Sequence, residues 1–188
     1  RWKPLGFIEP GQALRRSGAQ PGDLVYVSGW PGEAAAGLEA LRRGVATGAD
    51  DALVRRYQFA EPRLALGRDL RGRASSAMDV SDGLLGDLAK LCTASGVGAR
   101  LDLDRLPVSP QLRRRYAAEE CEQFVLCGGD DYELLFTLPM HTAVALEQAL
   151  AGRHVLTLIG QVEAEPGVRC MRDGRPVEVS GGGYDHFA

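Results

Sequence analysis

A strand that turns sharply into a helix is the feature that most constrains what this chain can fold into. Residues 74–80 are small or apolar, as expected of a buried strand. From Asp82 onward, Leu84, Leu88 and Leu91 recur at helical spacing, so we expect an amphipathic helix over 82–95. The chain therefore predicts a strand–turn–helix unit with polar residues concentrated at the turn.

The rest of the chain alternates between strand-like and helix-like segments. We expect strands at 24–29, 97–103, 132–138, 155–162, 168–172 and 176–179, and helices at 33–43, 50–57, 62–70, 110–118, 119–126 and 141–150. Strands and helices in this order predict an α/β fold, or α+β sandwich. Residues 1–22 are rich in Gly and Pro and are interpreted as a connection into a domain that covers 23–188.

The composition excludes several classes of function. The 188 residues carry a net charge of −3, so no basic field favours nucleic acid. No apolar run approaches the ~20 residues that cross a bilayer, and the first residues lack a signal-peptide core. The four cysteines form no C-x-x-C pair, which predicts reduced thiols in a cytoplasmic protein.

The turn after the strand offers oxygen ligands. Asp79 and Ser81 share a face by the two-residue period of a strand, and Asp82 lies beside a helix start. Two carboxylates and a hydroxyl suit a hard cation such as Mg²⁺, and the free N–H groups of a helix start suit an anion. The alternative is that Ser81 or Asp82 only caps the helix.

Three further segments could carry chemistry. Two glycines precede three acids in the run from Cys127 to Glu133, which predicts either a ligand site or a solvated acidic turn. One arginine of the pair Arg15-Arg16 could clamp a phosphate, or lie exposed in a loop. Near the end of the chain, Tyr184 could stack on a flat heterocycle or simply dock the tail.

No Walker loop, protein-kinase signature or G-x-S-x-G nucleophile occurs in the sequence. Taken in order, four segments resemble thiamine-monophosphate kinases. They are R-S-G-A-x-x-G-D at 16–23, M-D-V-S-D-G-L-x-x-D-L at 78–88, G-G-D-D-Y-E-L-x-F at 128–136 and G-Y-D-H-F at 183–187. The resemblance covers residues 6–188 and places the chain in the carboxy-terminal half of the aminoimidazole ribonucleotide synthetase-like superfamily.

That resemblance implies an activity and a set of site residues. It implies ATP-dependent phosphorylation of thiamine monophosphate to thiamine diphosphate, with Mg²⁺ as cofactor, in a cytoplasmic homodimer joined through an amino-terminal domain that this chain lacks. It implies Asp79 and Asp82 as magnesium ligands, and Arg16 and Ser81 as ATP contacts. It also implies Asp130 and Tyr184 as contacts for thiamine monophosphate, with Asp130 standing where many relatives have Glu.

Two alternatives remain open at this point. One is a related synthetase of the same superfamily, of the selenophosphate or aminoimidazole ribonucleotide type. The other is a non-catalytic fragment that binds ligand without turnover.

Transfer between two phosphates requires positioning and charge neutralisation more than a nucleophile or a strong base, which agrees with a site built from acids.

Overall fold

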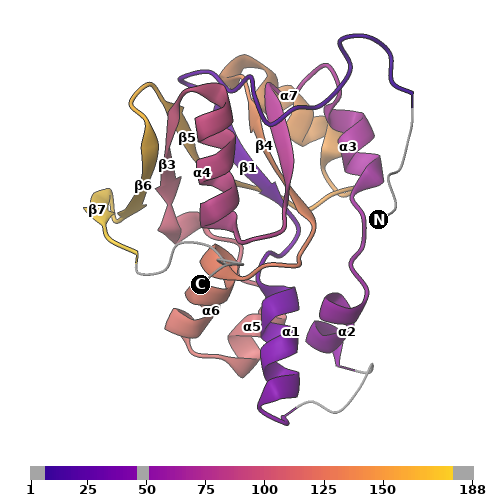
Figure 1. Cartoon of the computed structure of the whole chain (residues 1–188), viewed down its shortest axis with the longest axis vertical. Helices are drawn as coiled ribbons and strands as arrows, with labels where there is room; N and C mark the ends of the chain where they lie inside the picture. Colours follow the sequence, from indigo (N-terminus) through magenta and orange to yellow (C-terminus); the bar gives the residue numbers. More distant parts are fainter. Residues whose placement is uncertain (1–6, 46–50, 180–188) are drawn as a thin grey trace.

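The computed structural model describes residues 7–45 and 51–179, and within them one sheet organises the fold (Figure 1). The sheet has the strand order β2-β4-β1-β5-β3-β6-β7. Its strands are β1 (Leu24–Ser28), β2 (Ser76–Val80), β3 (Gly98–Asp102), β4 (Glu133–Leu138), β5 (Leu156–Glu163), β6 (Gly167–Arg172) and β7 (Arg175–Val177). Only the pair β3–β6 is parallel and the other neighbours are antiparallel, which confirms an α/β fold built on a mixed sheet.

Helices cover both faces of this sheet and one of its ends. They are α1 (Glu33–Arg42), α2 (Ala52–Gln58), α3 (Leu64–Leu70), α4 (Leu84–Ser95), α5 (Pro110–Arg115), α6 (Ala118–Cys127) and α7 (Met140–Leu150). Figure 1 shows α4 against one face, and α1, α2, α5 and α6 gathered below the sheet, where β1 leads into α1. The chain from Pro10 to Gly22 forms only turns and extended segments.

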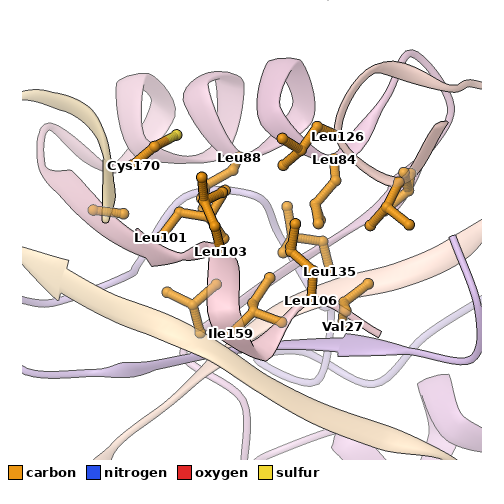
Figure 2. Packing of buried hydrophobic residues seen from close by; sticks show 14 of the residues in the cluster. Val27, Leu84, Leu88, Leu101, Leu103, Leu106, Leu126, Leu135, Ile159 and Cys170 are labelled. Carbon is orange, nitrogen blue, oxygen red and sulfur yellow. The ribbon is translucent and has the colours of Figure 1, made fainter. Parts of the chain in front are cut away.

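Two apolar clusters fill the two sides of the sheet. Side chains alternate along a strand, so Val25 and Val27 of β1 face one cluster while Tyr26 faces the other. The first cluster contains the apolar face of α4, and Figure 2 shows Leu84 and Leu88 pointing from that helix toward the strands. The second cluster includes the buried leucines of α3 and α7.

Each segment expected to be a strand or a helix is one, with ends displaced by a few residues. The displacement that matters most for the site is at the start of α4. This helix begins at Leu84 rather than Asp82, because Gly83 has φ +109°, outside the helical region. The four cysteines are free thiols, and Cys92, Cys121 and Cys170 are buried. Among the described residues, no helix has the length and apolar character needed to span a membrane.

Candidate functional site

The turn between β2 and α4 is held by a buried carboxylate, Asp87. Its Oδ2 atom accepts hydrogen bonds from the backbone N–H groups of Ser81 at 2.8 Å and Asp82 at 3.0 Å. The N-cap residue of α4 is Gly83, and no side chain caps this helix. The helix-cap alternative for Ser81 and Asp82 is therefore wrong, because these residues are held by Asp87 and do not cap the helix.

Lys90 completes this arrangement from the next turn of α4. Its Nζ atom donates to Asp87 Oδ1 at 2.8 Å and also pairs with the carboxylate of Asp82. Asp87 is fully buried, whereas the side chain of Asp82 is 30% exposed. The hydrogen bond to Asp82, and then the one to Asp87, raise the pKa of Lys90. The lysine thus stays charged and neutralises two carboxylates at once.

The segment between α6 and β4 packs directly on this turn. The backbone N–H of Asp130 donates to the carbonyl oxygen of Ser81 at 3.0 Å, and that of Tyr132 donates to Val80 at 2.9 Å. Gly129 permits this contact, since a Cβ there would lie 2.4 Å from the carbonyl oxygen of Ser81. The two motifs that sequence reasoning singled out separately therefore form one structure.

The backbone of the same segment is unusual. Asp130 and Tyr132 both have positive φ values, +65° and +53°, although neither is glycine. Such residues in the left-handed region are strained and tend to occur at functional sites. The alternating conformation directs successive acids to different places, since Asp130 is exposed while Asp131 is buried.

Asp131 and Glu133, whose roles were open from sequence, both act inside the fold. Asp131 accepts hydrogen bonds from the N–H groups of Gly32 at 2.6 Å and Ala34 at 3.1 Å, at the start of α1. Burial raises the pKa of Asp131 to about 7, against the opposing effect of those two hydrogen bonds. The acid holds α1 against β4, and it does not face the cavity that Asp130 lines.

Glu133 is fully buried and anchors two further helices. Its carboxylate accepts a bidentate pair from Arg63 at 2.6 and 2.7 Å and a third hydrogen bond from Arg56 at 2.9 Å. Ser28 Oγ donates to the same carboxylate at 2.5 Å. Since Arg56 lies on α2 and Arg63 at the start of α3, this network fixes both helices to the end of β4.

Two cavities meet at Tyr132, which lines both. The first, of about 630 Å³, brings together Ser81, Asp82 and Asp130. The second, of about 850 Å³, contains Asp79. The strand period predicted that Asp79 and Ser81 share a face of the strand. Ser81 instead lies in the turn, because β2 ends at Val80, and the two residues line different cavities.

Aromatic, apolar and charged side chains surround the smaller cavity. Its lining includes Ala35, Leu38, Glu39, Arg42, Tyr57, Gln123, Phe124, Cys127, Gly128 and Gly129. Acids beside aromatic rings suit a flat, cationic ligand. The larger cavity instead combines apolar side chains with Arg63, Arg68 and Arg71, beside the acid of Asp79.

Of the two remaining expected site residues, Arg16 is described by the structure and lies away from Ser81. The carbonyl oxygen of Arg16 accepts a hydrogen bond from Ser95 at 3.2 Å, at the carboxy-terminal end of α4. Ser81 precedes the opposite end of that helix, whose 12 residues span about 18 Å. The backbone of Arg16 is thus distant from Ser81, and its role as an ATP contact stays a prediction. Tyr184 lies outside the described residues.

The donor set fits magnesium in part. Asp79 and Asp82 supply carboxylate oxygens, which Mg²⁺ prefers, and one or two carboxylates with phosphates and water often suffice for this ion. Within residues 7–45 and 51–179, no group of three or more His, Cys, Asp or Glu side chains could hold a metal ion. A magnesium ion here would thus take only one or two protein carboxylates from the described part of the chain.

The residues that support the site were not predicted from the sequence. Asp87 falls inside the D-G-L-x-x-D-L pattern, and an acid on the apolar face of a helix was the available signal. Lys90 shares that helix. Arg56 and Arg63 gave no local signal, since they lie 77 and 70 residues away from their partner Glu133.

Comparisons with known proteins give consistent results. Residues 20–173 match the family model described as AIR synthase related protein, C-terminal domain. The chain is 47% identical to a thiamine-monophosphate kinase of Escherichia coli over 188 residues, which is 97% of this chain and 58% of that protein. It is 38% identical to the thiamine-monophosphate kinase of Caulobacter vibrioides, covering 53% of it. The chain thus spans little more than half the length of these relatives.

Solved structures agree. The crystal structure of thiamine-monophosphate kinase from Stenotrophomonas maltophilia superposes with a TM-score of 0.82 at 39% identity, over 90% of this chain and 56% of that one. The structure of AaThiL complexed with AMPPCP and TMP gives a TM-score of 0.76 at 34% identity, over 93% and 54%. The hydrogenase maturation protein HypE of Escherichia coli, at 22% identity and TM-score 0.68, shares the fold.

Proposed function

This chain belongs to the AIR synthase related family, whose C-terminal domain it contains, and from that membership we propose that the full-length protein is a thiamine-monophosphate kinase. It would transfer the γ-phosphoryl group of ATP to thiamine monophosphate and release thiamine diphosphate and ADP. The observation that carries this proposal is the contact between Ser81 and Asp130, which joins the two motifs shared with those kinases. The 47% identity to the Escherichia coli enzyme supports the same choice of substrate.

On the nucleotide side, we assign Ser81 and Arg16 to ATP and Asp79 and Asp82 to Mg²⁺. The relative solved with AMPPCP, an ATP analogue, and TMP supports nucleotide binding in this family. Magnesium bound to phosphate oxygens supplies charge neutralisation during phosphoryl transfer. Asp87 and Lys90 contribute by fixing the backbone and the carboxylate of Asp82 before any ligand arrives.

On the acceptor side, we assign Asp130 and Tyr184 to thiamine monophosphate. Asp130 is exposed and lines the 630 Å³ cavity together with Tyr57, Phe124 and Tyr132. A carboxylate close to aromatic rings suits the positive charge and flat rings of thiamine. We further propose that the full-length protein is a cytoplasmic homodimer, and that its amino-terminal domain forms the dimer contact.

The test is an assay of the full-length protein with ATP, Mg²⁺ and thiamine monophosphate, in which thiamine diphosphate is measured by chromatography. We expect product in step with ADP release, and near-complete loss in Asp82→Asn. A matched control is Asp104→Asn, which changes an acid in the segment after β3 that lines neither cavity. ATP consumption with selenide or an aminoimidazole precursor, and none with thiamine monophosphate, would instead favour the related synthetases.

A further inference from the structure

Lys90 is chemically exceptional in this chain. The sequence contains two lysines, Lys3 and Lys90, against 20 arginines. The ammonium group of Lys90 lies between two carboxylates, on Asp82 and at 2.8 Å from Asp87 Oδ1. Among the ion pairs of the described residues, the one that includes a carboxylate assigned to magnesium is formed by a lysine.

The two partners of Lys90 differ in their surroundings. Asp87 is fully buried and holds the Ser81–Asp82 backbone, so removing its counter-charge would leave a buried anion unpaired. The carboxylate of Asp82 is 30% exposed and lines a 630 Å³ cavity, so solvent and ligands reach it. The contact with Asp87 is structural, whereas the contact with Asp82 is exchangeable.

Lysine also suits an exchangeable contact better than arginine. A guanidinium binds a carboxylate through two parallel hydrogen bonds, as Arg63 does with Glu133. An ammonium is a compact, strongly hydrated point charge on a flexible stem, and it leaves a carboxylate without breaking a bidentate pair. Nζ can move off Asp82 by rotation of its stem while α4 stays in place.

We propose that the Lys90 ammonium competes with the divalent cation for Asp82, and so sets the metal affinity of this carboxylate. In the metal-free protein Lys90 neutralises Asp82 and keeps it oriented into the cavity. When the metal binds, Nζ leaves Asp82 and remains on Asp87. This inference rests on the magnesium role proposed for Asp82, and it adds a residue that tunes that role.

Direct metal binding tests the proposal without reference to turnover. Mn²⁺ is titrated into the full-length protein, and free Mn²⁺ is followed by electron paramagnetic resonance. Lys90→Gln removes the charge and keeps a donor for Asp87, so we expect binding tighter by about fivefold, the size of one exposed ion pair. Lys90→Arg keeps the charge and should bind no more tightly than the wild type.

The matched control is Arg105→Gln. It removes one positive charge from a similarly exposed pair, in which Arg105 follows β3 and Asp102 is the last residue of that strand. This variant should leave Mn²⁺ binding unchanged, which separates a local effect from the change in net charge. If Lys90→Gln binds Mn²⁺ as the wild type does, or more weakly, the proposal is overturned.

A second measurement uses the wild-type protein, so it decides the matter even if Lys90→Gln fails to fold. Acetic anhydride acylates lysines as free amines, and the modified peptides are quantified by mass spectrometry. We expect Lys90 to be acylated several-fold faster with saturating Mg²⁺, because the ammonium loses one of its two carboxylates. An unchanged rate at Lys90 would contradict the proposal.

These outcomes are independent of the kinase assay. If the wild type makes no thiamine diphosphate but Lys90→Gln binds Mn²⁺ more tightly, the proposed function is refuted. The competition between Lys90 and the metal for Asp82 is then still supported. If the wild type makes thiamine diphosphate, but Lys90→Gln does not change Mn²⁺ affinity and Mg²⁺ does not change the acylation rate of Lys90, the proposed function is supported. The competition at Asp82 is then refuted.

Discussion

The backbone N–H of Asp130 donates a 3.0 Å hydrogen bond to the carbonyl oxygen of Ser81. This bond joins the turn that follows β2 to the segment that precedes β4, so a residue assigned to ATP and a residue assigned to thiamine monophosphate are held by adjacent backbone. Donor and acceptor of the phosphoryl group would be aligned by one rigid contact. Positioning of this kind is the main requirement of phosphoryl transfer.

Gly129→Ala should break that alignment. The added Cβ would lie 2.4 Å from the carbonyl oxygen of Ser81, so the two backbones must separate. We expect a loss of kinase activity on the order of a hundredfold, as for other small misplacements, with only a modest loss of stability. The control is Gly67→Ala in α3, where a Cβ would meet only Leu134 at 4.0 Å. Activity in Gly129→Ala near that of the control would show that the contact does not matter.

Asp87→Asn should destabilise the fold more than Asp82→Asn does. Both carboxylates pair with Lys90, but Asp87 is fully buried and also accepts two backbone hydrogen bonds. We expect urea unfolding to show a loss of about 2–4 kcal/mol for Asp87→Asn, somewhat less than for a fully buried pair because Lys90 is partly exposed. Asp82→Asn should lose about 1 kcal/mol or less, as for an exposed pair. Equal losses would show that Asp87 does not hold the turn.

Glu133→Gln should loosen α2 and α3. The change keeps the shape of the side chain but leaves Arg56 and Arg63 without their shared anion. Since both arginines are partly exposed, we expect a loss of about 2–4 kcal/mol in the free energy of unfolding. Glu165→Gln removes a carboxylate that is 85% exposed and 3.9 Å from its arginine, and should cost less than about 0.5 kcal/mol. Hydrogen exchange should increase in α2 and α3 of Glu133→Gln.

Asp131 should make stability depend on pH. Burial raises its pKa in the folded protein to about 7, whereas an unfolded Asp titrates near ~3.9. The folded state therefore binds the proton more tightly, and its stability falls as pH rises from about 4 to 7. The difference in pKa corresponds to on the order of 4 kcal/mol.

The measurement is denaturant unfolding of the wild type and Asp131→Asn at pH 5 and pH 8. The asparagine does not titrate, so the wild type should lose more stability between these pH values than the variant does. The substitution should therefore cost more at pH 5 than at pH 8. An identical cost at both pH values would mean that Asp131 is ionised throughout this range.

Much of the fold could be predicted from the sequence because local periodicity determines it. The alternation along β3 and the helical spacing of leucines in α4 are local patterns, and both elements are present. The start of α4 was misplaced because Asp82 and Gly83 look like ordinary helix-start residues. Their actual conformation depends on Asp87, whose carboxylate holds the N–H groups of the turn.

The site was predicted in part for the same reason. Ser81, Asp82 and Asp130 stand out locally and do share a cavity. The division of labour among Asp130, Asp131 and Glu133 could not be predicted, because it depends on the positive φ of Asp130 and Tyr132 and on distant partners. No local pattern connects Glu133 with arginines 70 or more residues earlier in the chain.

Because Asp131 and Glu133 anchor α1, α2 and α3, these helices can be fixed only after a later part of the chain has been translated. A ribosome makes these three helices before the segment that holds them, since Gly32 precedes Asp131 by 99 residues and Arg63 precedes Glu133 by 70. Contacts between such distant residues are slow to form, because the long intervening segment must close into a loop first. During translation, α1, α2 and α3 lack these partners until β4 leaves the ribosome, and Arg56 and Arg63 remain solvated until then. A nascent chain stalled before residue 131 would expose the helices that the finished domain locks in place.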